Sequence, residues 1–272
     1  MTPLSQHIED YPEGIILPVD KPWRWTSADV IRKLKFAAVR HFRKKNLKVG
    51  HAGTLDPLAT GVLLVCIGPA TRRAEELQRH DKEYLAGISF GATTPSYDLE
   101  KEIDRRFPTD GVSEAALRAV LPSFLGEQEQ VAPLFSAKSV DGVRAYELAR
   151  RAYRRGEFEP GMAELLTRNR IRIDDIGLLR FEPEGHPAPP ASDGISAASA
   201  RIRVQDISAL GLPRADIRVV CSKGTYIRAL ARDLGEALGS GAFLDSLCRS
   251  RTGDYRIEEA LTLDQALALF NW

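Results

Sequence analysis

KVGHAGTLDPLATGVLLVCIGPAT, residues 48–71, is the most constrained stretch of this chain. It places one carboxylate, Asp56, in a turn just ahead of the apolar run 62–67, which predicts a buried strand. Two glycines before the aspartate permit backbone angles closed to other residues, and the proline after it fixes its own φ. An Asp-Pro pair is also a common start of an ordinary turn. The density of constraint favours a carboxylate held on a rigid loop, with the ordinary turn as the alternative.

The length and composition predict a globular protein. The 272 residues are 43% hydrophobic, enough for one large domain or two smaller ones. The longest apolar runs fall far short of the roughly 20 residues that a membrane helix needs. The amino end lacks a basic start followed by an apolar stretch, so no signal peptide is expected. The cysteines Cys66, Cys221 and Cys248 lie far apart and have no metal spacing, which predicts reduced, packed thiols and a cytoplasmic location.

The basic residues are unevenly distributed. The formal net charge is only +1, yet residues 32–48 carry arginines and lysines with no acid among them. Such a run is typical of a solvated helix face. Because it leads directly into the Asp56 turn, we favour a surface that binds phosphates.

The hydrophobic periodicity predicts a mixed α/β (α+β) fold. A helix capped by Thr26 or Ser27 should continue to residue 42. Further helices are expected at 71–79, 113–121, 144–155 and after the turn 222–226, and strands at 15–19, 62–67, 82–90, 170–180, 201–208 and 214–221. The segment 182–199 is rich in Pro, Gly and Ser, which predicts a flexible surface loop.

A family resemblance gives these elements a function. GHAGTLDPLATGVL, residues 50–63, resembles the signature G-H-x-G-T-L-D-P-x-A-x-G-V-L of the TruB family of tRNA pseudouridine synthases. The resemblance implies the pseudouridine synthase fold, with a central, largely antiparallel sheet, flanking helices and a catalytic cleft. It also implies that Asp56 is the catalytic nucleophile.

Two further segments resemble the same family near the amino end. Asp20-Lys21-Pro22 followed by Thr26-Ser27 is similar to the family's DKPxGxTS, and implies that Lys21 binds substrate. The residues between them, Trp23-Arg24-Trp25, lack the family's glycine. Lys82-Glu83-Tyr84 is similar to K-x-Y, and implies that Tyr84 stacks on the target base and handles a proton. The alternatives are a surface lysine in a turn and a tyrosine that fills the core.

Two other segments resemble the family near the carboxyl end. CSKGTYIR, residues 221–228, implies that Arg228 pairs with Asp56 and that Tyr226 lines the uridine pocket. Bidentate pairing would orient the carboxylate and keep it ionised. LCRSRTG, residues 247–253, implies that Leu247 contacts the base. Ordinary surface charge and core packing are the alternatives for the arginine and the leucine. A weaker similarity covers residues 133–149.

The implied reaction converts uridine to pseudouridine, at position 55 in the T-loop of tRNA. It breaks the N1–C1′ bond and rejoins the base through C5, so we expect no cofactor and no metal. Asp56 either attacks C1′ or promotes a glycal route. The uridine must be flipped out at a cost of roughly a few kcal/mol. His51 is then expected to order the vacated space, with a satisfied turn histidine as the alternative.

The expected partner is the tRNA T-stem-loop, bound by a monomer that needs neither a membrane nor a guide RNA. We expect a catalytic domain at 1–258 and a short tail at 259–272. The guide-dependent dyskerin branch fits less well, because the tail leaves no room for its PUA domain. Two alternatives from other classes are an RNA-binding or tRNA-folding module without catalysis, and a sugar hydrolase, which lacks an obvious second acid.

Overall fold

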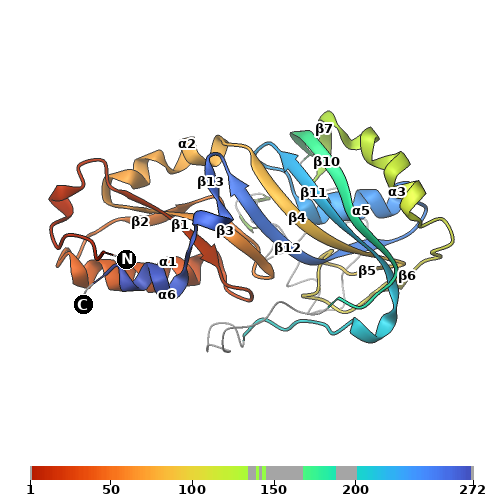
Figure 1. Ribbon diagram of the computed structural model, residues 1–272, viewed down its shortest axis with the longest axis horizontal. Helices are drawn as coiled ribbons and strands as arrows, with labels where there is room; N and C mark the ends of the chain where they lie inside the picture. The colour runs from red at the N-terminus through yellow and green to blue at the C-terminus, as the bar shows by residue number, and fades with distance from the viewer. Residues whose placement is uncertain (1, 134–138, 141–142, 145–167, 188–200, 271–272) are drawn as a thin grey trace. The chain divides into compact units, whose positions relative to one another are not determined.

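The structure, a computed structural model, describes residues 2–133, 139–140, 143–144, 168–187 and 201–270 (Figure 1). The chain divides into two compact units. The first unit consists of Met1–Leu85, Pro189–Arg203 and Ser246–Trp272, and the second of Ala86–Ala188 and Val204–Asp245. Strands β4 (Lys82–Phe90) and β12 (Ala242–Thr252) each contribute residues to both units.

The first unit is built on the central strand β3 (Ala59–Ile67). This strand pairs antiparallel with β1 (Ile15–Lys21) and β2 (Val49–Ala52), and parallel with β12. Two short strands extend the sheet: β13 (Tyr255–Arg256) pairs with β12, and β14 (Leu261–Thr262) pairs with β1. The strand that follows the Asp56 turn is therefore paired along both edges, as its continuous apolar sequence predicts.

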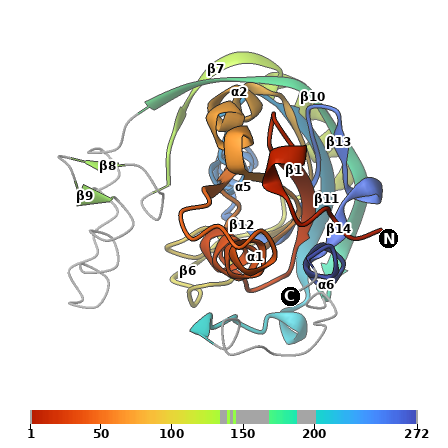
Figure 2. The same cartoon turned by 90° about the vertical axis from the view of Figure 1, so that its left-hand side faces the viewer.

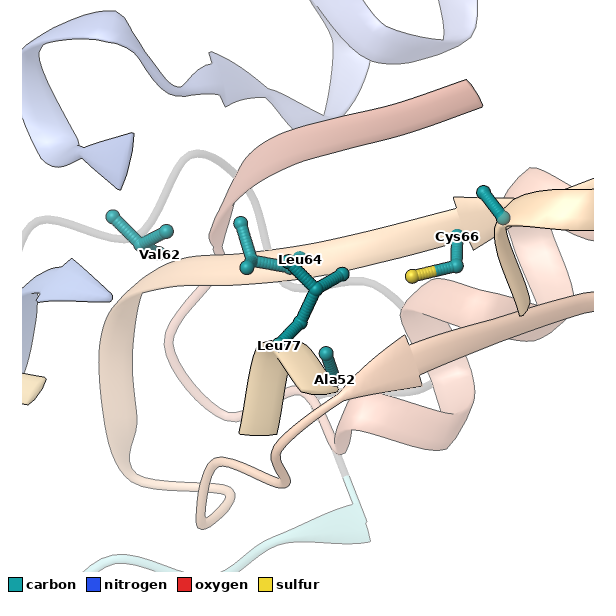
Figure 3. Packing of buried hydrophobic residues seen from close by; sticks show 6 residues of the cluster. Ala52, Val62, Leu64, Cys66 and Leu77 are labelled. Carbon is teal, nitrogen blue, oxygen red and sulfur yellow. The ribbon is translucent and has the colours of Figure 1, made fainter. Parts of the chain in front are cut away.

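Helices cover both faces of this sheet. Helices α1 (Ser27–His41) and α6 (Leu263–Ala268) lie on one side and α2 (Ala74–Arg79) on the other, as Figures 1 and 2 show. The side chains of β3 alternate between the two faces. Leu64 and Cys66 pack with Leu77 of α2 and with Ala52 (Figure 3). Short 3-10 helices complete the unit at Ile8–Asp10, Gly68–Arg73 and Ile257–Glu259.

The second unit centres on the long antiparallel pair β10 (Arg168–Gly185) and β11 (Leu212–Cys221). Strand β7 (Gly126–Val131) continues the sheet by pairing antiparallel with β10. Two small antiparallel pairs lie outside it, β5 (Ala92–Thr93) with β6 (Arg105–Arg106) and β8 (Ser139–Val140) with β9 (Val143–Arg144). Among its described residues the helices are α3 (Glu114–Val120) and α5 (Ile227–Ala237), with 3-10 turns at Leu121–Phe124 and Ser208–Leu210.

The expected mixed α/β class and the largely antiparallel pairing are confirmed. The predicted cap of α1 is also confirmed, because Thr26 accepts from the Asp29 amide and the Asp29 carboxylate accepts in return. The helix expected at 71–79 begins only at Ala74, since a 3-10 turn with a proline in its first turn precedes it. No helix among the described residues is long and apolar enough to cross a membrane.

The strand predicted at 201–208 is wrong. Residues 202–207 form no strand; the Gln205 amide donates to the Leu99 carbonyl, and the Ile207 carbonyl accepts from the Leu210 amide. Asp206 then accepts from both the amide and the hydroxyl of Ser208, which turns the chain into a 3-10 helix. The segment carries enough apolar residues for a strand, but the turn at Asp206 prevents the chain from continuing as one.

Two other expectations concern segments that lie largely outside the residues that the structure describes. Strand β10 continues to Gly185, so it covers the first four residues of the expected loop 182–199, and residues 188–200 lie outside the described part. Most of the helix expected at 144–155, and much of the segment 133–149, also lie outside it. The division at residue 258 stays a prediction, although β14 and α6 beyond it belong to the first unit.

Candidate active site

Asp56 lies half-buried in the connection between β2 and β3. Its carbonyl accepts from the Ala59 amide at 3.1 Å, which closes a tight turn. Gly53 begins the connection with a φ of 92°, a conformation that favours glycine. The residue just before the aspartate, Leu55, is held by Ser27, whose hydroxyl accepts from the Leu55 amide at 2.9 Å and lies 3.2 Å from its carbonyl. The first residue of α1 therefore anchors the Asp56 loop, residues 53–58.

Lys21 anchors the same loop from β1. Its side chain is fully buried, and Nζ donates to the carbonyls of Pro22 at 2.9 Å, Trp25 at 2.6 Å and Pro57 at 3.2 Å. Burial lowers the pKa of Lys21 to about 7, and the charge of Asp56 acts against that shift. Lys21 thus lies close enough to Asp56 for their charges to interact, and it binds the carbonyl of Pro57, the next residue in the loop. These contacts give it a structural role, and its contact with substrate stays a prediction.

Arg249 is a residue that the sequence reasoning missed. It lies in β12, is 1% exposed, and donates to carbonyls on both sides of Asp56. Its Nε binds the Val62 carbonyl at 2.8 Å, Nη2 binds Gly53 at 3.1 Å and Nη1 binds Thr54 at 3.4 Å. The segment LCRSRTG contains it, but only its leucine received a role there. No signal in that segment separates it from Arg251, which lies two residues further along.

Leu247 and His51 both lie beside this loop. Leu247 of β12 is half-buried and pairs in register with Ala59, the first residue of β3. His51 belongs to β2, and its Nδ1 is a buried atom with no hydrogen-bond partner among the described residues. Burial and the nearby charge of Arg249 lower the pKa of His51, so its ring is neutral at pH 7. Their contacts with a base stay predictions.

Tyr84 lies in the half of β4 that belongs to the first unit and is 9% exposed. It lies on the same face of the strand as Lys82, which is buried and donates to the carbonyl of His80 at 2.6 Å. The first unit therefore contains five of the predicted site residues: Lys21, His51, Asp56, Tyr84 and Leu247. Stacking of Tyr84 on a base stays a prediction.

Tyr226 and Arg228 belong to the second unit, at the start of α5. The backbone of Tyr226 is fixed by Gln130, which accepts from its amide at 2.8 Å and donates to its carbonyl at 3.1 Å. Arg228 is 5% exposed and donates to the Ser96 carbonyl at 3.1 Å, with Nε 3.8 Å from Asp98. Its pairing with Asp56 stays a prediction.

Asp98 is a second residue that the sequence reasoning did not single out. Its carboxylate accepts from the Ser96 hydroxyl at 2.6 Å and from the Glu100 amide at 3.0 Å, which fixes its orientation beside Arg228. The segment around it, TTPSYDLE, is dense in turn-forming residues. No spacing within that segment points to an arginine 130 residues along the chain.

Comparison with known proteins shows the family to which this sequence belongs. The family described as TruB family pseudouridylate synthase (N terminal domain) matches residues 40–184, which include the whole Asp56 loop. This chain belongs to the TruB family. A tRNA pseudouridine synthase B from Phocaeicola vulgatus is 47% identical over 255 residues, covering 94% of this chain and 92% of that protein. A protein of the same name from Thermus thermophilus is 43% identical, covering 90% and 75%.

Solved structures share the fold of this TruB-family chain. A chain of a Cbf5–Nop10–Gar1 complex aligns with a TM-score of 0.60 at 25% identity, covering 96% of this chain and 56% of that one. A chain of an H/ACA RNP bound to a substrate RNA containing 2′-deoxyuridine aligns with a TM-score of 0.58 at 23% identity, covering 96% and 55%. This chain thus spans about half the length of those solved chains. The likeness confirms the expected pseudouridine synthase fold.

The departure from the TruB motif at Trp23-Arg24-Trp25 has a structural account. Arg24 occupies the position of the family's glycine and adopts a φ of 62°, in the left-handed region. Its Nη2 donates to the Ile202 carbonyl at 2.5 Å, and its guanidinium lies 5.6 Å from the ring centre of Trp23. The backbone therefore keeps the conformation that the glycine would provide, while the side chain gains contacts that a glycine lacks.

Proposed function

We propose that this protein is a tRNA pseudouridine synthase that isomerises the uridine at position 55 in the T-loop. The observation that carries the proposal is the Asp56 loop, in which Ser27, Lys21 and Arg249 hold the backbone on both sides of the aspartate. A nucleophile must be aimed as well as anionic, and a loop fixed from three elements meets that need. The names of the TruB-family relatives support the same activity.

The chemistry needs one carboxylate and no external reagent. The N1–C1′ bond breaks, a bond forms between C5 and C1′, C5 loses its proton, and N1 gains one, so the product is an isomer. Asp56 attacks C1′ or removes the 2′ proton, and the contacts of its loop serve either route. Arg228 pairs with the carboxylate, and Tyr84 stacks on the base and handles a proton.

The uridine must leave its RNA stack to reach Asp56. The buried Nδ1 of His51 lacks a partner among the described residues and is suited to bind a group that the RNA brings. Because the ring is neutral, it accepts or donates one hydrogen bond rather than attracting a phosphate. Tyr226 and Leu247 line the pocket of the flipped base, and Lys21 supports the pocket from beneath the loop.

The basic stretch 32–48 binds the RNA backbone. Two of its cations pair with acids, Arg32 with Asp29 at 2.8 Å and Lys44 with Glu9 at 3.3 Å. Five others have no ion pair within the described part of the chain: Lys33, Lys35, Arg43, Lys45 and Lys48. Each phosphate that they neutralise releases counterions, so binding weakens as salt rises. The protein acts as a monomer in the cytoplasm, without a guide RNA.

The deciding experiment incubates the purified protein with an unmodified tRNA transcript and maps pseudouridine, with no guide RNA present. Wild-type protein should modify position 55, and Asp56→Asn should abolish the product while still binding the transcript. Asp254→Asn, at an exposed acid in the same unit, is the matched control and should keep full activity. Modification elsewhere, modification only with a guide RNA, or full activity in Asp56→Asn would overturn the proposal.

A further inference from the structure

Arg249 is a buried cation that takes no part in the chemical steps proposed above. Its guanidinium spends its hydrogen bonds on three backbone carbonyls, and none of its contacts is a carboxylate among the residues that the structure describes. Removing such a charge from water costs several kcal/mol when no counterion accompanies it. An apolar residue of similar size would fill the same space without that penalty. The reason for an arginine at this position therefore lies in the carbonyls that its guanidinium binds.

The three carbonyls are placed to define the Asp56 loop. Gly53 and Thr54 lie before the aspartate, and Val62 lies after it in β3, so one planar group joins the start of the loop to the strand that follows it. The backbone of Arg249 is equally close, because it pairs in register with Gly61 in the parallel β3–β12 ladder. A guanidinium has donors in a fixed fork, whereas an ammonium is a point charge on a flexible stem. The fork separates its donors in space and so reaches carbonyls that lie apart, whereas the single nitrogen of a lysine here would have to reach all three from one point.

The charge of Arg249 also reaches the loop. After burial itself, its charge is the next cause that lowers the pKa of His51, five residues before Asp56. It also acts on Lys21, which binds the other side of the loop. The start of the loop thus lies beside a positive charge, and the carbonyl oxygens of Gly53 and Thr54 accept from Arg249.

We propose that Arg249 is a positioning residue for Asp56: its guanidinium joins the start of the loop to β3 and holds the carboxylate in the orientation from which it reacts. The proposal rests on the proposed function, because it takes Asp56 as the nucleophile. It assigns Arg249 no contact with RNA. Loss of the fork should therefore slow the chemical step and leave RNA binding intact.

The test measures kcat and KM for Arg249→Lys and Arg249→Gln on a tRNA transcript. We expect kcat to fall at least tenfold in the lysine variant and on the order of 100-fold in the glutamine variant, as for other misplaced catalytic groups. KM should change less than about threefold, since the substrate contacts are untouched. Arg251→Lys is the matched control: Arg251 lies two residues along the same strand, donates to the Gly253 carbonyl at 3.0 Å, and should keep wild-type kcat.

The rates are expressed per molecule that binds RNA, with thermal melting to measure the folded fraction. A purely structural role would lower that fraction and leave kcat per binding-competent molecule unchanged, which would overturn the proposal. If Arg249→Gln does not fold, Arg249→Lys decides, and wild-type kcat in it would also overturn the proposal. Asp56→Asn is assayed alongside. Activity in that variant would sink the nucleophile assignment, whereas an active Arg249→Lys with an inactive Asp56→Asn sinks only the role of Arg249.

Discussion

Two connections of the first unit carry family motifs, yet they meet the same backbone demand in different ways. The Asp56 loop begins with a glycine, Gly53, at a φ of 92°. The turn 22–25 places Arg24 at a φ of 62°, where the family has glycine. A left-handed conformation costs a non-glycine residue about 1–2 kcal/mol. The Asp56 loop avoids that cost and is held by side chains of other elements, while the turn accepts it and is held both by Lys21 of β1 and by its own arginine.

The largest expected effect is at Gly61, where the exit of the Asp56 loop meets Arg249. A Cβ there would lie 2.7 Å from the backbone nitrogen of Arg249 and 2.8 Å from its carbonyl carbon, and φ is 99°. Because backbone cannot rotate away, Gly61→Ala should destabilise the fold by roughly 3–5 kcal/mol. Chemical denaturation measures it, with Gly50→Ala as the control, since a Cβ at Gly50 meets nothing within 4 Å. A loss at Gly61 no greater than at Gly50 would contradict this close approach.

The next effect concerns Lys21 and the pH dependence of stability. Its pKa falls from 10.5 to about 7 on folding, so between those values the unfolded chain binds the proton and the folded chain does not. Stability should therefore rise with pH across that window, by up to roughly 1.4 kcal/mol per pH unit. The difference in unfolding free energy between wild type and Lys21→Met isolates this contribution from other titrating groups. A difference that stays constant from pH 7 to pH 10 would contradict the depressed pKa.

The smallest expected effect on stability concerns Arg24, which is compared with Gly53, the residue with a positive φ in the Asp56 loop. Arg24→Ala keeps the strained backbone and loses the bond to the Ile202 carbonyl, whereas Arg24→Gly loses the bond but relieves the strain. Arg24→Gly should thus be more stable than Arg24→Ala by about 1 kcal/mol.

Gly53→Ala provides the converse substitution. A Cβ at Gly53 has room, 3.6 Å from Nη1 of Arg249, so its cost of about 1–2 kcal/mol comes from the backbone alone. Equal stability of Arg24→Ala and Arg24→Gly would show that the turn adapts rather than holding Arg24 in the left-handed region.

Local signals predicted the local structure well. The cap of α1 at Thr26 and the apolar runs of β1, β3 and β4 were found where the sequence predicted them. The strand expected at 201–208 failed because one Asx turn at Asp206 outweighed its apolar pattern. Propensity and spacing report only on residues that are close together in the sequence. They predict structure best where the hydrogen bonds also join neighbouring residues, as in caps and turns.

The site was only partly accessible from sequence. Asp56 and Lys21 stood out because their motifs are contiguous, and the structure brings them within electrostatic reach. Arg249 and Asp98 did not, because each acts on residues far along the chain through contacts that no spacing encodes. Burial of a charged side chain, not its place in a motif, marks such residues, and burial is known only once the chain is folded.

Cys66 makes the sheet beneath the Asp56 loop observable in solution. It lies in β3, is fully buried, and has a pKa raised by burial to about 11, so its thiol is inert to alkylation in the closed state. A reagent can modify it only when the strands around it part. The rate of labelling then measures how often the strands open. It therefore reports the rigidity of the sheet on which the orientation of the Asp56 carboxylate depends.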